Sequence, residues 1–572
     1  MSAVPGTETH AGAAAPDSPP GGPTLSYIPA LDGIRGVAMV VIMGYHGGVF
    51  FGRGGFYSLD TFFALSGFLI TSLLVAEWQR TSSVRLRLFW SRRARRLLPG
   101  LVAMLLGVSL SAAFLVPAGT YPDLRADGLS SLFYVANWHF IATGSNYFGQ
   151  TGLASPLLHL WSLAVEEQFY LLWPLLVLAI LKKWASLRVL LVVCVVGALA
   201  SALEMALLYS PSDANRLYYG TDTRAQSLLV GAALAVALAL VARRRRHLGT
   251  LSPAAGATAR PVGGDPAWAA TTASGCRALV GLGAVGVAGS VALWILVSSN
   301  DAFAYRGGFL LAALSTALIL LSVVCAQGSV LARGLSVAPV RYVGRISYGM
   351  YLWHWPLFLY IDGARTGLTG WSLFGVRAVA TVAVATASFY VVERPIRQGR
   401  FLRGRRPWLV APVAVVGTVV ALLTSTVVPA VALPPGRAPT PAAAPLAAGR
   451  GGPPVTVLIV GDSTALTVAI GLDGSAAAYG VRSHDGGILG CGVTSGGEYQ
   501  LKGVDAPMAA PCTGSGSSPQ WPAVWRAEMA RWHPDVVMIL VGRWEVSNRT
   551  YEGRWTDILD PVYAAYVKQQ LD

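Results

Sequence analysis

Charged residues are scarce in this chain of 572 residues: Asp, Glu, Lys and Arg together make up 12%, about half the share usual in soluble domains. Hydrophobic residues make up 54%, and many stand in long runs. A run of about 20 apolar residues is long enough to cross roughly 30 Å of hydrocarbon. This composition excludes an ordinary soluble globular protein and predicts a polytopic α-helical membrane protein surrounded by a lipid bilayer.

Acidic residues are fewer than basic ones: the chain has 28 Asp and Glu and 43 Lys and Arg, so its net charge is +15. In a soluble protein such an excess would suggest a nucleic-acid partner. Here the basic residues gather in short loops between apolar runs, where they set the orientation of membrane spans. We therefore expect no nucleic-acid partner.

Cysteine is also rare, and five residues are too few for a disulfide framework. Cys194 and Cys325 lie within apolar runs and Cys276 opens another, so we expect them to be packing residues. Cys491 and Cys512 fall in a polar C-terminal region. If that region is extracytoplasmic, they can form a disulfide bond. No metal site is predicted.

Eleven apolar runs, bounded by charge, Gly or Pro, predict about eleven transmembrane helices. They cover approximately 27–50, 57–77, 97–117, 160–181, 187–208, 223–242, 275–297, 306–326, 344–362, 371–391 and 408–432. Residues 1–26 are rich in Ala, Pro, Gly and Thr and lack a basic start, so they predict a disordered cytoplasmic tail and not a signal peptide.

Basic residues gather in every second loop between the eleven predicted spans. Arginines or lysines crowd the loops after the second, fourth, sixth, eighth and tenth runs, including Arg92, Arg95 and Arg397, whereas the intervening loops carry few. By the positive-inside rule the N-terminus is cytoplasmic and the C-terminal region is extracytoplasmic.

The composition divides the chain into five parts. The tail is followed by a membrane domain at 27–400, an additional transmembrane helix with a basic cytoplasmic flank at 401–432, and a Pro/Ala linker at 433–454. Two short apolar runs, 455–460 and 535–541, end in glycine and predict strands of a small α/β domain at 455–572.

The first predicted span carries Arg35 near its cytoplasmic end and His46 eleven residues later. On a helix the two lie roughly 16 Å apart along the axis and within about 20° of one face. An intramembrane charge usually faces the protein interior or a watery path. The alternative is that both residues are structural: Arg35 snorkels to the membrane interface, and His46 is a core histidine with its hydrogen bonds satisfied.

Further motifs follow in order along the chain and resemble those of the membrane-bound acyltransferase family 3, over about residues 27–400. The Arg35/His46 pair matches that family's Arg-x10-His motif and Arg93/Arg96 its Arg-x-x-Arg motif. The other segments are 60–70, 159–170, 344–356 and 392–395.

The resemblance implies an acyl-coenzyme A donor, most simply acetyl-CoA, which is bound as a substrate and not as a permanent cofactor. Arg35, Arg93 and Arg96 are the candidate acyl-CoA ligands because guanidinium groups suit phosphates; alternatively Arg93 and Arg96 only orient the span. His46 lies a pantetheine-like distance from Arg35. A neutral imidazole can act as general base on an acceptor hydroxyl or as a transient nucleophile, and the sequence does not choose.

Four other polar residues of the membrane domain are weaker candidates. Glu166 and Glu167 enter the fourth span at the same end as His46, where a carboxylate can assist the histidine or only cap the helix; Glu167 is favoured. His354, between two tryptophans, is more often a structural histidine. Asp32, three residues before Arg35, is expected to pair with an arginine.

In the C-terminal region a serine, Ser463, follows the first strand in a Gly-Asp-Ser sequence, which resembles the first block of SGNH hydrolase-like domains. The resemblance implies an acyl-carrying nucleophile, with Gly490 or Gly492 shaping an oxyanion site; the alternative is a helix cap. The expected Gly-x-Asn block is absent at Gly542, and no histidine follows it. The domain is therefore degenerate or truncated, and truncation is favoured.

These observations together predict an integral membrane O-acyltransferase. It would move an acyl group, most simply acetyl, from cytoplasmic acyl-CoA to a hydroxyl of an extracytoplasmic glycan or glycolipid. One alternative is a transporter with an intramembrane Arg/His path. Another is an esterase in which only the outer domain is catalytic.

Overall fold

The structure is a computed structural model, and it describes most of the membrane-spanning part and parts of the C-terminal region. The described residues are 27–49, 54–115, 120–145, 147, 154–210, 214–247, 273–299, 301–398, 407–425, 454–473, 476, 480–488, 493–494, 498–501, 504–507, 521–542, 548–556, 558 and 560–571. The chain forms two compact units, Met1–Val428 and Pro429–Asp572.

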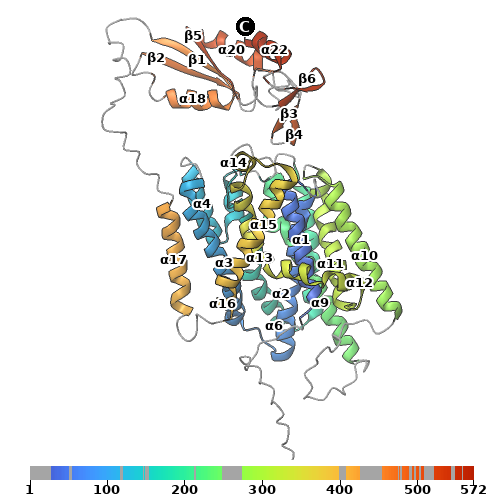
Figure 1. The fold of residues 1–572 in the computed structure, drawn as a ribbon. Coiled ribbons are helices and arrows are strands. Elements are labelled where there is room, and N and C mark those ends of the chain that lie inside the picture. The colour runs from blue at the N-terminus through green and yellow to red at the C-terminus, as the bar shows by residue number, and fades with distance from the viewer. Residues whose placement is uncertain are drawn as a thin grey trace, which may run out of the picture. The chain divides into compact units, whose positions relative to one another are not determined.

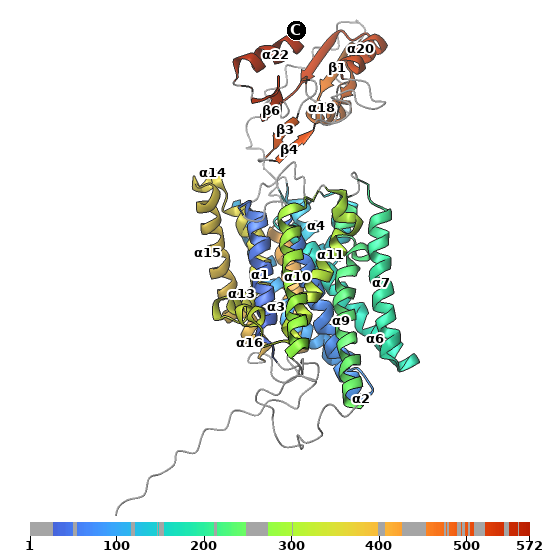
Figure 2. The same ribbon diagram turned by 90° about the vertical axis from the view of Figure 1, so that its right-hand side faces the viewer.

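The first unit is a bundle of long helices that run roughly alongside one another (Figures 1 and 2). Within the described residues, each of the eleven predicted spans corresponds to one long helix: α1 (Pro29–Gly47), α2 (Ser58–Thr81), α3 (Leu86–Leu115), α6 (Trp161–Trp184), α7 (Leu187–Leu207), α9 (Thr221–His247), α10 (Ala273–Leu296), α11 (Phe309–Cys325), α13 (Ala338–Tyr360), α15 (Gly370–Ser388) and α17 (Pro407–Ser425). Eight helical stretches of the described chain are long and apolar enough to cross a membrane. The prediction of a polytopic helical membrane protein is confirmed.

Short helices connect the long ones. They are η1 (Gly55–Tyr57), α4 (Tyr121–Leu132), α5 (Ala136–Ala142), η3 (Leu158–Leu160), α8 (Ala214–Tyr219), α12 (Val330–Leu335), α14 (Gly363–Thr366) and α16 (Arg394–Arg397), with π-helical turns η5 (Ala304–Gly308) and η6 (Phe389–Glu393). The segment 118–159, expected only as a loop, contains α4 and α5. Both are too short to span a membrane, which explains why the hydropathy pattern did not reveal them.

Helices α1 and α13 pack backbone against backbone. A Cβ atom at Gly344 of α13 would lie 1.7 Å from the Asp32 carbonyl oxygen of α1, and one at Gly36 of α1 would lie 2.4 Å from the Val340 oxygen of α13. Real Cβ atoms do not approach other atoms so closely, so both positions require glycine. The motif glycines therefore fix the contact that sets α1 and its polar residues against α13.

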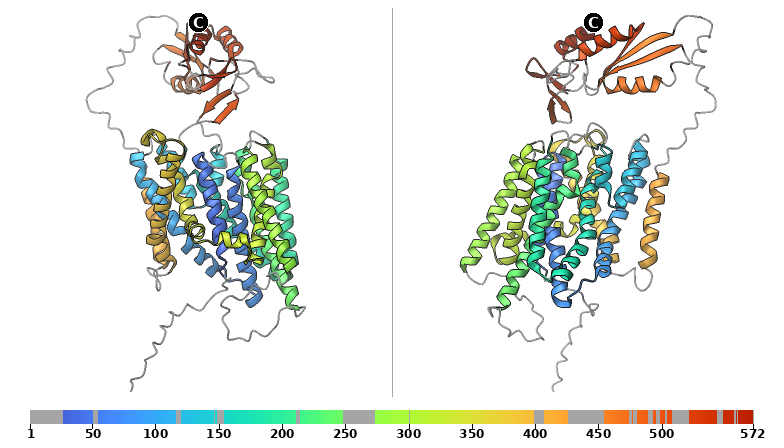
Figure 3. Two further views of the ribbon diagram at one scale, coloured as in Figure 1. Left: turned by 45° about the vertical axis from the view of Figure 1, so that its right-hand side comes forward. Right: turned by 180° about the vertical axis from the view of Figure 1, so that it is seen from behind.

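The second unit contains a parallel three-stranded sheet in the order β2–β1–β5, from Val481–Gly487, Val455–Gly461 and Val536–Leu540. Alternate residues of β1 face opposite ways: Ile459 packs on α18 (Ser463–Asp473), whereas Leu458 packs with α20 (Trp521–Trp532). Helices thus cover both faces of the sheet (Figure 3). The two predicted strands and the α/β class are confirmed.

A second, antiparallel sheet has the order β4–β3–β6–β7, from Val504–Pro507, Glu498–Leu501, Asn548–Tyr551 and Arg554–Thr556, and α22 (Pro561–Leu571) follows it. Several predictions lie outside the described residues: the tail at 1–26, the linker at 433–453, and Gly490, Cys491, Gly492 and Cys512. The backbone of Ser463 is described, but its side chain is not.

Candidate active site

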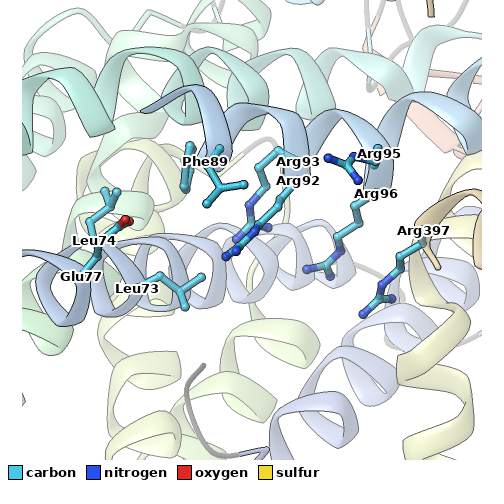
Figure 4. Close-up of a pocket in the computed structure, with 10 residues that line it drawn as sticks. Leu73, Leu74, Glu77, Phe89, Arg92, Arg93, Arg95, Arg96 and Arg397 are labelled. Atoms are coloured by element: carbon cyan, nitrogen blue, oxygen red, sulfur yellow. The ribbon is translucent and has the colours of Figure 1, made fainter. Parts of the chain in front are cut away.

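Arginine side chains surround a cavity of about 320 Å³ between α2, α3 and α16. We call it the arginine cavity; its lining residues are Leu73, Leu74, Glu77, Leu88, Phe89, Arg92, Arg93, Arg95, Arg96 and Arg397. Figure 4 shows Arg92, Arg93 and Arg96 extending from α3, with Arg397 reaching the same space from another helix. This cluster of positive charge is suited to an anion with several phosphate or carboxylate groups.

A second cavity, the inner cavity, shares Arg93 and Arg96 with the first and continues between α1, α2, α3, α6 and α13. Arg35 also lines it, so the structure brings the three predicted donor ligands together. Ser162 and Tyr351 line the same cavity, and their hydroxyl oxygens lie 2.6 Å apart. The inner cavity thus leads from a cationic region to a neutral, hydroxyl-bearing one.

Arg35 donates to the Asp32 carboxylate, with Nη1 3.3 Å from Oδ1. This confirms the predicted pairing of Asp32 with an arginine. Asp32 also accepts a hydrogen bond from the Tyr27 hydroxyl at 2.8 Å. Asp32 therefore anchors the start of α1 and orients Arg35 toward the inner cavity.

Glu166 lies among the arginines' neighbours and not beside His46. Its Oε1 accepts hydrogen bonds from the hydroxyls of Ser66 and Tyr170, and it lines the inner cavity with Arg93. Because α6 begins at Trp161, Glu166 and Glu167 lie beyond its first turn and cap nothing. The prediction that one of these carboxylates assists the histidine is not supported by the geometry: His46 has other partners on both ring nitrogens.

Those partners are His354 and Tyr147. His46 Nδ1 lies 2.9 Å from His354 Nε2, and His46 Nε2 lies 2.7 Å from the Tyr147 hydroxyl. The two imidazoles are nearly parallel, with centroids 5.1 Å apart, and Trp355 stands edge-on to His46 at 4.8 Å. Burial raises the pKa of the Tyr147 phenol well above its usual range, so the phenol keeps its proton beside His46.

A third histidine supports this pair through a helix defect. Pro356 has no N–H, so the Leu352 carbonyl one turn earlier in α13 lacks its usual helical donor. His159 Nε2 lies 3.1 Å from that oxygen and donates to it. The His159 ring then stands edge-on against His354, with centroids 5.4 Å apart. The carbonyl oxygen left free by Pro356 thus binds His159, and His159 in turn packs against His354.

The histidine cluster, which we define as His46, His354 and His159, adjoins the inner cavity through Tyr351. The Tyr351 ring lies 5.3 Å from the His354 ring, and Tyr351 also lines the cavity. A ligand held by arginines at one end can therefore extend toward an imidazole at the other. This arrangement can bind a long anionic molecule and transfer a proton at its far end.

The sequence did not single out Tyr147, Tyr351 or Arg397 as site residues. Arg397 was counted only among the basic loop residues, although it reaches the arginine cavity about 300 positions after Arg96. Tyr147 lies in a polar segment with no recognisable motif. Tyr351 belongs to the 344–356 segment, and its spacing of three residues from His354 was the one available signal.

Comparison with known proteins places this site in a family. The family described as acyltransferase domain matches residues 28–393. Peptidoglycan O-acetyltransferase OatA of Listeria monocytogenes is 37% identical over 380 residues, covering 66% of this chain and 57% of that protein. O-acetyltransferase OatA of Staphylococcus aureus is 32% identical over 379 residues, covering 66% and 58%.

The putative peptidoglycan O-acetyltransferase YrhL of Bacillus subtilis is 35% identical over 387 residues, covering 66% of this chain and 56% of that protein. The chain thus spans a little over half the length of these relatives, and no solved structure matches it. The family match covers the histidine cluster, the inner cavity and the whole lining of the arginine cavity except Arg397. On this evidence, the chain belongs to the acyltransferase domain family whose motifs its sequence resembles.

Proposed function

We propose that this protein is an integral membrane O-acetyltransferase that takes an acetyl group from cytoplasmic acetyl-CoA and delivers it to a hydroxyl of an extracytoplasmic glycan. Family membership and relatives named peptidoglycan O-acetyltransferases support this activity. Those names make peptidoglycan the first acceptor to test. The orientation, with the N-terminus cytoplasmic and the second unit extracytoplasmic, is part of the proposal and rests on the basic loops.

One observation carries the proposal: the arginine cavity, the inner cavity and the histidine cluster adjoin one another in this order. The arginine cavity would hold the phosphates of coenzyme A, and the inner cavity would hold the pantetheine arm. The shared residues Arg93 and Arg96 stand where the two parts of such a donor join. The thioester would then lie near Tyr351, one ring away from His354.

In the proposed step His46 acts as general base. The acceptor hydroxyl gives its proton to a ring nitrogen of His46 while its oxygen bonds to the thioester carbonyl carbon. The carbon–sulfur bond then breaks, and the sulfur leaves as a thiolate. The thiolate takes the proton back from the imidazolium, so the products are the O-acetyl ester and free coenzyme A thiol.

The second unit is proposed to receive or position the acetyl group. Ser463 directly follows Gly461 and Asp462 at the end of β1 and begins α18. Gly461 has φ +141°, and a Cβ there would lie 1.8 Å from the Leu540 oxygen of β5, so the turn from strand to helix requires glycine. A serine on such a turn lies at the carboxyl edge of the sheet, where α/β proteins bind their ligands.

The test uses the full chain in proteoliposomes with labelled acetyl-CoA and glycan strands derived from peptidoglycan. We expect labelled ester in the glycan from the wild type, and a loss of about 10²- to 10⁴-fold in kcat for His46→Ala. Ser463→Ala separates a direct route from one through the second unit. Transfer that is unchanged in His46→Ala would overturn the mechanism. Ester hydrolysis that needs no acetyl-CoA and only Ser463 would favour an esterase.

A further inference from the structure

Hydrogen bonds around His354 determine which of its nitrogens carries the proton. Its Nδ1 lies 2.7 Å from the backbone carbonyl oxygen of Tyr351. A carbonyl oxygen can only accept, so Nδ1 carries the hydrogen. A neutral imidazole has one N–H, so His354 Nε2 presents a lone pair. His354 is fully buried, and this lone pair points at His46.

The lone pair on His354 fixes the proton on His46 in turn. His46 Nδ1 lies 2.9 Å from His354 Nε2, and this contact is a hydrogen bond only if His46 Nδ1 is the donor. Two imidazolium ions would set two N–H groups against each other at this distance. His46 Nε2 is then left as an acceptor, and the Tyr147 hydroxyl donates to it at 2.7 Å.

We propose that His354 is the positioning residue that holds His46 in its Nδ1–H form, so that Nε2 of His46 is the nitrogen that takes the proton of the acceptor hydroxyl. The inference rests on the proposed acetyl transfer and adds the role of a second histidine, 308 positions away, that does not touch the substrate. In this proposal the acceptor hydroxyl would take the position beside His46 Nε2 that the Tyr147 hydroxyl occupies in the structure.

The same chain of hydrogen bonds stabilises the reaction's charge. When Nε2 accepts a proton, His46 becomes an imidazolium and its Nδ1–H becomes a stronger donor. His354 can accept that bond because its own proton is held by the Tyr351 carbonyl. Histidine His159, edge-on to His354 and tied to Leu352, keeps the accepting ring from turning. A side chain at 354 without an acceptor loses both effects.

The test compares two replacements of similar size at position 354. In His354→Gln, the amide oxygen reaches about as far as Nε2 and can accept from His46. In His354→Met, no comparable acceptor is present. We expect His354→Met to lower kcat by about 10²- to 10⁴-fold, as loss of the correct histidine tautomer does elsewhere. The KM for acetyl-CoA should not change, and His354→Gln should keep kcat within about tenfold of the wild type.

Equal loss in both variants, or full activity of His354→Met, would overturn the inference. The wild type and the His46→Ala variant separate this failure from failure of the proposed function. If the wild type transfers acetyl groups, His46→Ala is inactive and His354→Met is active, only the role of His354 is wrong. If His46→Ala is active, the general-base mechanism is wrong, and if the wild type transfers no acetyl group from acetyl-CoA, the proposed function is wrong.

A second measurement does not depend on the folding of the two variants at position 354. The ¹⁵N NMR spectrum of wild-type protein labelled at histidine, compared with that of His46→Ala, reports the tautomer of His46 directly. We expect a protonated Nδ1 and a bare Nε2. The opposite tautomer would overturn the inference whatever the activities are.

Discussion

Two groups of arginines lie within the membrane unit, and their surroundings differ completely. Arg224 is fully buried, donates to the Asp60 carboxylate at 3.1 Å, and has its guanidinium carbon 4.1 Å from the centre of the Phe309 ring. Arg93 and Arg96 line open cavities, and within the described residues neither forms a salt bridge. The Arg93 guanidinium carbon lies 5.7 Å from the centre of the Phe89 ring and 5.1 Å from that of the Tyr170 ring.

The difference shows which charges belong to the fold and which await a ligand. A buried ion is tolerated only when another charge compensates it, and Arg224 has this compensation from Asp60. Ser227 adds a third group, because its hydroxyl donates to Asp60 at 2.5 Å. The cavity arginines share the inner cavity with Glu166 but form no salt bridge within the described residues, an arrangement that suits a binding site for an anion.

The largest predicted effect comes from breaking the buried ion pair of Asp60 and Arg224. Asp60→Asn leaves the Arg224 charge buried and unpaired, and we expect the free energy of unfolding to fall by about 3–5 kcal/mol. Thermal unfolding in detergent measures it. Asp123→Asn, at an exposed site in α4, is the control and should change stability by less than about 0.5 kcal/mol.

A double variant sharpens this prediction. Asp60→Asn combined with Arg224→Gln removes both charges, so it should be more stable than Asp60→Asn alone. If the double variant is the less stable of the two, Arg224 does not depend on Asp60 for its charge, and the contrast with the cavity arginines fails.

Removing a cavity arginine should act on binding instead. Arg96→Gln removes a charge common to both cavities, and one charge-assisted hydrogen bond is worth about 1.5–3 kcal/mol. We therefore expect the KM for acetyl-CoA to rise about 10- to 100-fold with kcat nearly unchanged. Stability should stay equal or increase, because repulsion among neighbouring arginines is relieved.

Arg87→Gln is the matched control for Arg96→Gln: it is an exposed arginine of the same helix that lines neither cavity. It should leave KM as in the wild type. A loss of stability in Arg96→Gln comparable with that of Asp60→Asn would show that the two groups of arginines do not differ in role.

The smallest predicted effect belongs to Arg397, an exposed residue at the edge of the arginine cavity. Solvent and salt weaken its interaction with a bound phosphate. We expect Arg397→Gln to raise the KM for acetyl-CoA by about two- to fivefold at low ionic strength. The difference from the wild type should disappear in 1 M salt, where the Debye length is about 3 Å. A salt-independent increase would contradict this weak electrostatic role.

The sequence predicted the helices because each long apolar run carries its own signal, independent of its neighbours. It also predicted that Asp32 pairs with an arginine, and the structure shows that this is Arg35, three residues away on the same helix. It could not predict the contact between His46 and His354, which depends on how α1 packs against α13. It could not predict the contact of Glu166 with Ser66 for the same reason, because Ser66 comes from another helix.

The glycine contact between α1 and α13 also limits how the protein can work. With backbone against backbone at Gly36 and Gly344, the two helices cannot slide past each other without a steric clash. Arg35 and His46 lie on the same helix, about 16 Å apart along α1, and the contact keeps both fixed relative to His354 of α13. In the proposed reaction no hinge or rocking motion carries the acetyl group from Arg35 to His46. The flexible arm of coenzyme A spans this distance, and the fixed spacing in the protein must match the length of the arm.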